Sequence, residues 1–359
     1  MIDLPTFYFD FEASARGEED FKSSTRDVRV LLDELLEENV DAVIVDLRNN
    51  GGGSLSEANQ LVGLFIETGA TVQIRYSGIR NGFTRSFGDN NPEIAYDGPL
   101  AVLVNRTSAS ASEIFAGAIQ DYQRGIVLGG QTFGKGTVQE IIPMDYGQVK
   151  LTRSKFYRIS GASTQHRGVI PDIAFPDFYD AYDNIGESNL DGALPWDTVR
   201  PLEYNAYLAI QALLPELRQL HEDRAEVSPD FIHLIGQIER TRKLRTQEQL
   251  SLNEQVVKLE RETNRRAAFD AENMRRLLKG LTLEDWVSDA QREAAENEEE
   301  TAAELSDDVT LADNEASVEE EEVDEEKDPL LLESGRILAD FIALNERHIS
   351  VLDGISSDR

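Results

Sequence analysis

The chain has 359 residues, 40% of them hydrophobic, which allows a sizeable core and two or three domains. It has no cysteine, so disulfides, thiolate catalysis and cysteine metal ligands are excluded. A net charge of −33 argues against nucleic-acid binding through a basic surface. No apolar run is long enough to span a membrane, and residues 1–14 do not resemble a signal peptide.

Residues 1–176 alternate between strand and helix patterns, which predicts an α/β core with much parallel pairing. Segment 80–97 is rich in turn formers and is expected to be a loop or a β-hairpin. The expected elements are strand 6–11, helix 25–38, strand 42–47, helix 54–67, strands 71–76 and 99–104, helix 111–123, strand 126–130, and β runs at 138–142, 148–152 and 155–159.

From residue 177 the pattern becomes mainly helical, with leucines between 244 and 278 set among charged residues as in amphipathic helices. Their arginines could contact nucleic acid, but the interleaved glutamates favour a solvated or partner-facing surface. Residues 291–328 hold 18 acidic and two basic side chains, which predicts a flexible, solvated segment. Calcium binding is the alternative there, although the spaced ligands and glycine of an EF-hand are missing.

The predicted domains are a core at 1–176, a helical domain at 177–288, the acidic segment at 289–328 and a terminal helix at 329–359. The apolar residues between 330 and 344 predict that this last helix packs on the helical domain.

Ser110 and Lys135 are separated by one predicted helix and one returning strand. A helix of about 12 residues and a strand of five or six cover similar distances, so the lysine can return to the serine. A desolvated, partly neutral lysine can activate a serine hydroxyl, and this pattern indicates a Ser-Lys dyad. Taken alone, Ser110 could instead cap a helix through S-x-x-E, and Lys135 could be a solvated loop residue.

A second glycine-rich loop, NNGGG at 49–53, follows a buried strand pattern and precedes a predicted helix. Its backbone N–H groups could stabilise an oxyanion. The alternatives are a tight turn or a phosphate cradle, but no phosphate-binding motif is present. Asp46, at the end of the strand, is expected to hold this loop by accepting backbone hydrogen bonds.

The four histidines are scattered without metal-ligand spacing. His166 could complete a Ser-His-Asp triad in principle, and this remains an alternative to the Ser-Lys dyad.

Together these motifs resemble the carboxy-terminal processing, or tail-specific, serine protease family in its long proteobacterial branch. The matching segments are DLRNNGGG at 46–53, GPLAVLVN at 98–105, SASASE at 108–113, TFGKGTVQ at 132–139, STQHRGVIPDI at 163–173 and ALPWD at 193–197. The resemblance implies a ClpP/crotonase-like α/β core followed by a mainly α-helical C-terminal domain.

The resemblance also implies roles for individual residues. Ser110 would be the nucleophile, Lys135 the general base, and Gln139 the residue that orients the lysine amine. The oxyanion donors would be the backbone N–H groups of Gly53 and Ala111. No cofactor or metal is implied. The expected partners are protein or peptide substrates with nonpolar C-termini and an adaptor protein on the helical domain. The expected location is the periplasm.

Two departures from the family pattern affect these expectations. Members of this branch carry a PDZ domain before the core, whereas residues 1–8 resemble the strand that follows it, so we expect a core without the gating module. The stretch between Gln139 and Lys155 is also shorter than usual. The alternatives are a non-catalytic peptide- or partner-binding protein and a crotonase-like acyl-CoA enzyme, against which Ser110, Lys135 and ALPWD all argue.

Overall fold

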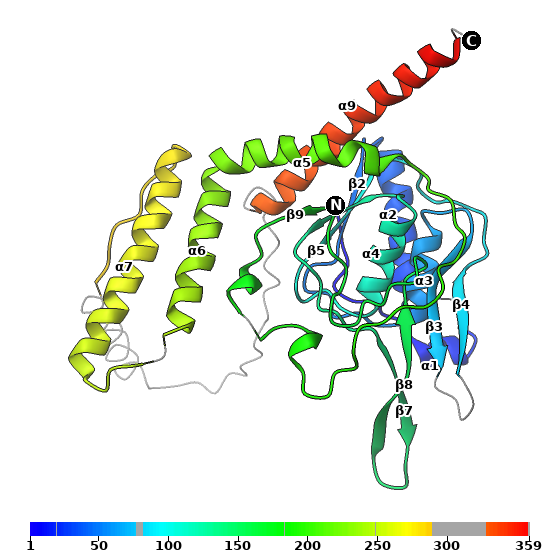
Figure 1. The fold of residues 1–359 in the computed structure, drawn as a ribbon, viewed down its shortest axis with the longest axis horizontal. Coiled ribbons are helices and arrows are strands. Elements are labelled where there is room, and N and C mark those ends of the chain that lie inside the picture. The colour runs from blue at the N-terminus through cyan, green and yellow to red at the C-terminus, as the bar shows by residue number, and fades with distance from the viewer. Residues whose placement is uncertain (19, 77–81, 183, 248, 289–327, 358–359) are drawn as a thin grey trace, which may run out of the picture. The chain divides into compact units, whose positions relative to one another are not determined.

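The computed structural model describes residues 1–18, 20–76, 82–182, 184–247, 249–288 and 328–357, with no side-chain description beyond residue 348. The chain divides into two compact units (Figure 1). The first contains residues 1–224 together with 330–359, and the second contains residues 225–329. Most of the predicted acidic segment lies outside the described residues, and the predicted domain boundaries stay predictions.

A five-stranded parallel sheet forms the centre of the first unit, with the strand order β1-β2-β5-β6-β9. Its strands are β1 (Ile2–Asp3), β2 (Val43–Asp46), β5 (Leu100–Val104), β6 (Ile126–Gly129) and β9 (Ile173–Ala174). The main connecting helices are α2 (Ser24–Glu37), α3 (Leu55–Gly63) and α4 (Ala111–Asp121). The predicted α/β core with parallel pairing is confirmed.

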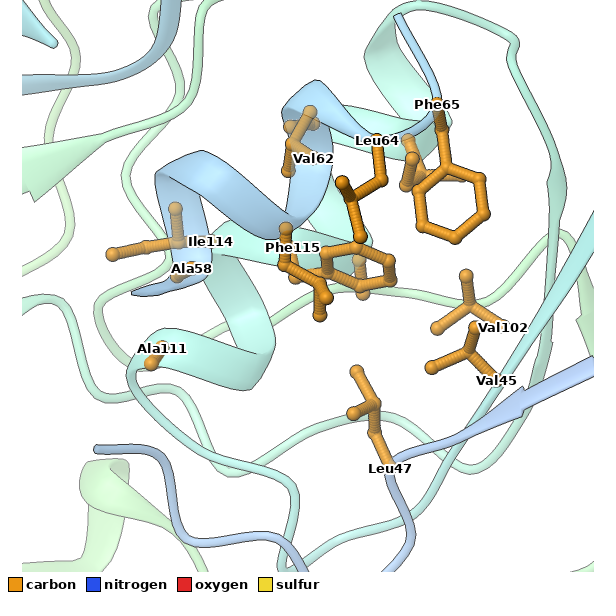
Figure 2. Packing of buried hydrophobic residues seen from close by; sticks show 14 of the residues in the cluster. Val45, Leu47, Ala58, Val62, Leu64, Phe65, Val102, Ala111, Ile114 and Phe115 are labelled. Carbon is orange, nitrogen blue, oxygen red and sulfur yellow. The ribbon is translucent and has the colours of Figure 1, made fainter. Parts of the chain in front are cut away.

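The core lies where α3 and α4 pack against each other and cover β2 and β5 (Figure 2). Every residue of β5 is buried, which explains the continuous apolar pattern of this central strand. Phe115 of α4 is fully buried and meets Phe65 edge-on, with ring centroids 5.9 Å apart. This packing fixes the start of α4 relative to the ends of β2 and β5.

A second, antiparallel sheet has the order β4-β3-β8-β7. Its strands are β3 (Gly69–Tyr76), β4 (Phe83–Asp89), β7 (Thr137–Pro143) and β8 (Gln148–Tyr157). Segment 80–97 therefore contributes β4, and the two predicted runs at 148–152 and 155–159 belong mostly to the single strand β8. The far ends of β7 and β8 form a hairpin that extends from the sheet (Figure 1).

The predicted strand 6–11 is wrong. Residues 7 and 9 form only isolated bridges, Phe7 with Gly53 and Phe9 with Ser23. Helix α1 (Phe11–Ala15) begins directly afterwards, because the Asp10 side chain accepts a hydrogen bond from the Ala13 N–H as its N-cap. The local β pattern thus binds the glycine loop and does not continue as a strand.

The prediction that the C-terminal region is mainly α-helical is confirmed. In the first unit, α5 (Ile210–Val227) contacts α9 (Pro329–Ser357) through buried charges. Glu333 accepts a hydrogen bond from Arg224 Nε at 2.9 Å and lies 3.0 Å from His221 Nδ1. Arg224 also pairs with Asp340 at 2.6 Å. Two short 3-10 helices, η1 (Phe178–Ala181) and η2 (Glu187–Asn189), precede α5.

The second unit contains α6 (Pro229–Arg245) and α7 (Glu254–Leu278). Helices are present in the predicted region, but the leucines that indicated an apolar face, among them Leu244, Leu259 and Leu277, are exposed, and α7 buries none of its residues fully. Charged groups link the two helices: Asp230 pairs with Arg275 and with Lys279, each at 2.7 Å.

Candidate active site

The glycine loop, Ser110 and Lys135 lie on connections that leave the carboxyl ends of three neighbouring parallel strands, whereas Gln139 lies on β7. The glycine loop follows β2, Ser110 follows β5, and Lys135 follows β6. Open parallel sheets place ligand sites at this edge, because all their strand-to-helix loops emerge there. The sheet therefore brings together segments that are more than 80 residues apart in sequence.

Ser110 occupies the N-cap position of α4 with φ of +58° and ψ of −109°. A positive φ is uncommon for a residue with a side chain and persists only where the surroundings impose it. The tight connection from β5 into α4 imposes it here, since Ser108 and Ala109 are both anchored to the glycine loop. Ser108 Oγ donates to Leu47 O at 2.8 Å, and Ala109 N donates to Asn50 O at 3.0 Å.

The glycine loop lies directly against Ser110. A Cβ placed on Gly52 would lie 2.9 Å from Ser110 Cβ and 3.0 Å from Ala111 N. Gly52 also has a φ of +105°, so both the space and the backbone angle require glycine. The tight turn proposed from the sequence is present, and it forms one wall beside the serine.

Two backbone N–H groups in the segments that meet at Ser110 donate no hydrogen bond among the described residues. The N–H of Gly52 is not one of them, because it donates to Asn50 Oδ1 at 2.9 Å. Among the described residues, the N–H groups of Gly53 and Ala111 have no hydrogen-bond acceptor. Ala111 is also the first residue of α4, where the helix dipole favours negative charge.

Glu113 connects the serine segment to the lysine segment. Its Oε2 accepts hydrogen bonds from Ser110 N at 2.7 Å and from Lys135 N at 3.0 Å. Its Oε1 accepts from Thr132 Oγ1 at 2.6 Å and from Gly134 N at 2.7 Å. One buried carboxylate thus fixes the main chain at both catalytic candidates.

Complete burial raises the pKa of Glu113 to about 7, because a charged carboxylate is poorly solvated in the interior. The four hydrogen bonds from Thr132, Ser110, Gly134 and Lys135 act in the opposite direction and favour the ionised form. Burial is the larger effect.

Lys135 is half-buried, and burial lowers the pKa of its ammonium group. Lys150 adds a smaller effect in the same direction, whereas Glu187 and Glu113 oppose it. A lowered pKa increases the neutral fraction of the amine, which is the form that can accept a proton.

Loop 163–168 supports the backbone on both sides of Lys135. His166 N donates to Gly134 O at 2.8 Å, and Gly136 N donates to Gln165 Oε1 at 2.9 Å. The Lys135 carbonyl itself accepts from Thr164 Oγ1 at 3.3 Å. The lysine therefore projects from a backbone that is anchored on several sides.

Some predicted contacts are not formed. Within the described residues, no hydrogen bond joins Ser110 Oγ, Lys135 Nζ or the side chain of Gln139. Gln139 lies exposed on β7, opposite Thr152. His166 Nε2 has no hydrogen-bond partner among the described residues, so it does not contact Ser110 in this way.

Asp46 holds the start of the glycine loop, as its position in the sequence predicts. It accepts a hydrogen bond from Arg48 N at 2.9 Å. The Arg48 guanidinium also pairs with the Asp46 carboxylate at 2.5 Å.

Two consecutive family models match this chain. Peptidase family S41 matches residues 2–175, and the C-terminal domain of tail-specific protease matches residues 181–343. The tail-specific protease of Haemophilus influenzae is 38% identical over 289 residues, which cover 77% of this chain and 38% of that relative. The chain belongs to the tail-specific proteases of peptidase family S41. It spans less than two-fifths of the length of this relative.

Other similar proteins match a smaller share of the chain. A carboxy-terminal-processing protease of Bartonella bacilliformis is 41% identical over 155 residues, or 42% of this chain and 35% of the relative. A solved photosystem II D1 C-terminal processing protease is 32% identical, covers 48% of this chain and 41% of its own, and has a TM-score of 0.38.

Three side chains that support the segments around Ser110 and Lys135 were not identified from the sequence: Glu113, Gln165 and Glu187. Glu113 was visible only as the acidic residue of a capping box, and its burial and its bonds to the lysine loop depend on tertiary packing. Gln165 lies inside the STQHRG motif, so the resemblance pointed to its segment but not to the residue itself. Glu187 lies outside every segment on which the resemblance rests.

Across the described part of the chain, no cluster of three or more potential metal-ligating side chains occurs. The helices described there also include none with the length and hydropathy of a membrane span.

Proposed function

We propose that this chain is a serine endopeptidase with a Ser-Lys dyad that cleaves proteins recognised by their C-terminal tails. The observation that carries the proposal is the convergence at Ser110: the glycine loop with its free N–H groups on one side, and the Lys135 loop tied through Glu113 on the other. A nucleophile, a desolvated amine and oxyanion donors are the components that acyl transfer requires.

The proposed reaction follows from these positions. Neutral Lys135 Nζ accepts the proton of Ser110 Oγ while the oxygen attacks the scissile carbonyl carbon. The N–H groups of Gly53 and Ala111 stabilise the oxyanion of the tetrahedral intermediate, each contributing about 3 kcal/mol. The lysine then returns the proton to the leaving amine. Water then attacks the acyl-enzyme while Lys135 accepts its proton, and Lys135 gives that proton to Ser110 Oγ as the ester bond breaks, which releases the acid product and the free serine.

Gln139 is proposed to orient the lysine amine once substrate is bound. Its exposed position on β7, four residues after Lys135, allows the side chain to turn toward the amine. Active-site hydrogen bonds are often long or unformed without substrate and tighten in the complex.

A direct test replaces each member of the proposed dyad. Ser110→Ala and Lys135→Ala should each abolish cleavage of an unfolded protein substrate, with the thermal unfolding temperature largely retained. Residues that act as one unit lose activity together, so the double variant should be no worse than either single variant. Full residual cleavage by a folded single variant would remove the assignment.

The second candidate is a non-catalytic peptide- or partner-binding protein. It is favoured by the absence, within the described residues, of a hydrogen bond between Ser110 Oγ and Lys135 Nζ. A fluorophosphonate probe that labels wild-type protein but not Ser110→Ala would reject it. Lack of labelling together with measurable peptide binding would support it.

We further propose that the substrates have nonpolar C-termini, that the protein works in the periplasm and that an adaptor binds the helical domain. The family relation supports these three points. Cleavage rates for one substrate ending in either apolar or charged residues would show whether this chain itself selects tails. If the two rates are equal, tail recognition does not reside in residues 1–359.

A further inference from the structure

A segment from the second family match packs against the core beside Lys135. We call residues 187–197 the strap; it includes the ALPWD motif. Trp196 Nε1 donates to Ser163 O at 2.9 Å, and the Arg167 guanidinium stacks 3.9 Å from the Trp196 ring. Asp197 accepts hydrogen bonds from Lys155 Nζ and from Tyr157 OH. The strap is thus bound to β8 and to loop 163–168.

Glu187, at the start of the strap, connects this segment to the lysine loop. Its side chain is buried, and its Oε1 accepts a hydrogen bond from Gln165 Nε2 at 3.1 Å. Gln165 is fully buried, and its Oε1 accepts from Gly136 N at 2.9 Å. The main chain of Glu187 also donates to Phe133 O at 3.0 Å. Glu187 therefore contacts the 133–136 segment from two directions.

The charges around Lys135 are of both signs. Glu113 on α4 and Glu187 on η2 are negative, and Lys150 on β8 is positive. On neighbouring segments, His166 lies on loop 163–168, and Arg106 donates from Nη1 to Thr132 O at 3.2 Å. Because Lys135 is half-buried, these charges are screened less than they would be at an open surface.

We propose that Glu187 is a positioning residue for Lys135: its buried carboxylate holds Gln165 against the lysine loop and carries a negative charge into the surroundings of that loop. The proposal rests on the proposed function of Lys135 as general base. The strap, which belongs to the C-terminal family match, would then act on the core in two ways. It stabilises the lysine loop, and its negative charge disfavours loss of the ammonium proton of Lys135 at lower pH.

The charge is tested by Glu187→Gln. The amide oxygen can still accept from Gln165 Nε2, so the loop geometry is kept while the negative charge is removed. The ammonium of Lys135 should then lose its proton at lower pH, and the rising limb of the kcat against pH profile should move to lower pH. Lys150→Gln removes a positive charge and should move the limb to higher pH. The exposed Glu203→Gln is the matched control and should leave the limb in place.

The hydrogen-bond link is tested separately by Gln165→Asn. The shorter amide cannot reach both Glu187 and Gly136, but no charge changes. We expect kcat to fall by up to about 100-fold, as for small misplacements of catalytic groups, with the limb near its wild-type pH. This variant also keeps the proposal open to refutation if Glu187→Gln fails to fold.

A readout independent of catalysis separates this proposal from the proposed function. Lysine labelled with carbon-13 at Cε reports the titration of Lys135, whose signal is assigned by its loss in Lys135→Arg. If wild-type protein cleaves nothing but Glu187→Gln still lowers the titration midpoint, the peptidase proposal fails and Glu187 retains its role. If cleavage occurs but Glu187→Gln and Glu203→Gln both titrate like wild type, the role of Glu187 is overturned.

Discussion

Ser110 and Lys135 are held by the same atom: Oε2 of Glu113 accepts hydrogen bonds from the backbone N–H of both residues, at 2.7 and 3.0 Å. The two residues are 25 positions apart in sequence, and a single buried carboxylate fixes the start of α4 relative to the loop after β6. The relative placement of the proposed nucleophile and base therefore depends on Glu113.

Glu113→Gln should lower both the activity and the free energy of unfolding. The amide has one oxygen, so at least two of the four N–H and O–H donors lose their acceptor, and its NH₂ group faces donors. Lost hydrogen bonds to a buried charged group cost about 1.5–3 kcal/mol each. We expect kcat to fall at least tenfold and the free energy of unfolding to fall by about 3–6 kcal/mol. Unchanged kcat would contradict the bridging role; the exposed Glu34→Gln is the control.

Glu113 should also make stability depend on pH. Its pKa is about 7 in the folded protein, above the ordinary value of 4.5. The folded state therefore binds more protons than the unfolded state between these values, and stability falls as pH rises through this window. Relative to Glu113→Gln, wild type should lose up to roughly 3 kcal/mol between pH 4 and pH 8 in chemical denaturation. A gain over this range would contradict the raised pKa.

Gly52→Ala should disrupt the site where Gly51→Ala does not. At position 52 a Cβ would lie 2.8 Å from Ala109 O and 2.9 Å from Ser110 Cβ, at a φ of +105°. At position 51 nothing lies within 4 Å. We expect Gly52→Ala to cost about 2–4 kcal/mol of stability and most of the activity. Equal effects of the two substitutions, measured by denaturation and cleavage rate, would argue against the close packing of loop and serine.

The lowered pKa of Lys135 predicts the form of the pH profile. The amine must be neutral to accept the serine proton, so kcat should rise with pH and level off below the ordinary lysine value of 10.5. His166→Ala should leave this limb unchanged, since no hydrogen bond connects Nε2 to Ser110 among the described residues. A limb near pH 6.5 that disappears in His166→Ala would favour a Ser-His-Asp triad instead.

Most of the core could be predicted from the sequence, because each strand, helix and turn there is indicated by residues within its own segment. Continuous apolar runs identified β2 and β5, and glycines marked the turn beside Ser110. Residues 6–11 were predicted incorrectly because their β pattern is satisfied by two isolated bridges, one from Phe7 to Gly53 of the glycine loop and one from Phe9 to Ser23. Glu113 and Glu187 could not be assigned, since burial of a carboxylate arises only when distant segments meet. The roles assigned to Ser110, Lys135, Gln139, Gly53 and Ala111 stay predictions that the experiments above would test.

The order of the parallel strands has a consequence for the newly synthesised chain. The glycine loop, the serine and the lysine come from β2, β5 and β6, which become neighbours only when the sheet assembles across more than 80 residues of sequence. Pairings of this kind form late, because loop closure costs entropy before the contacts repay it. A partly folded chain would thus contain every residue of the proposed site without bringing these residues together.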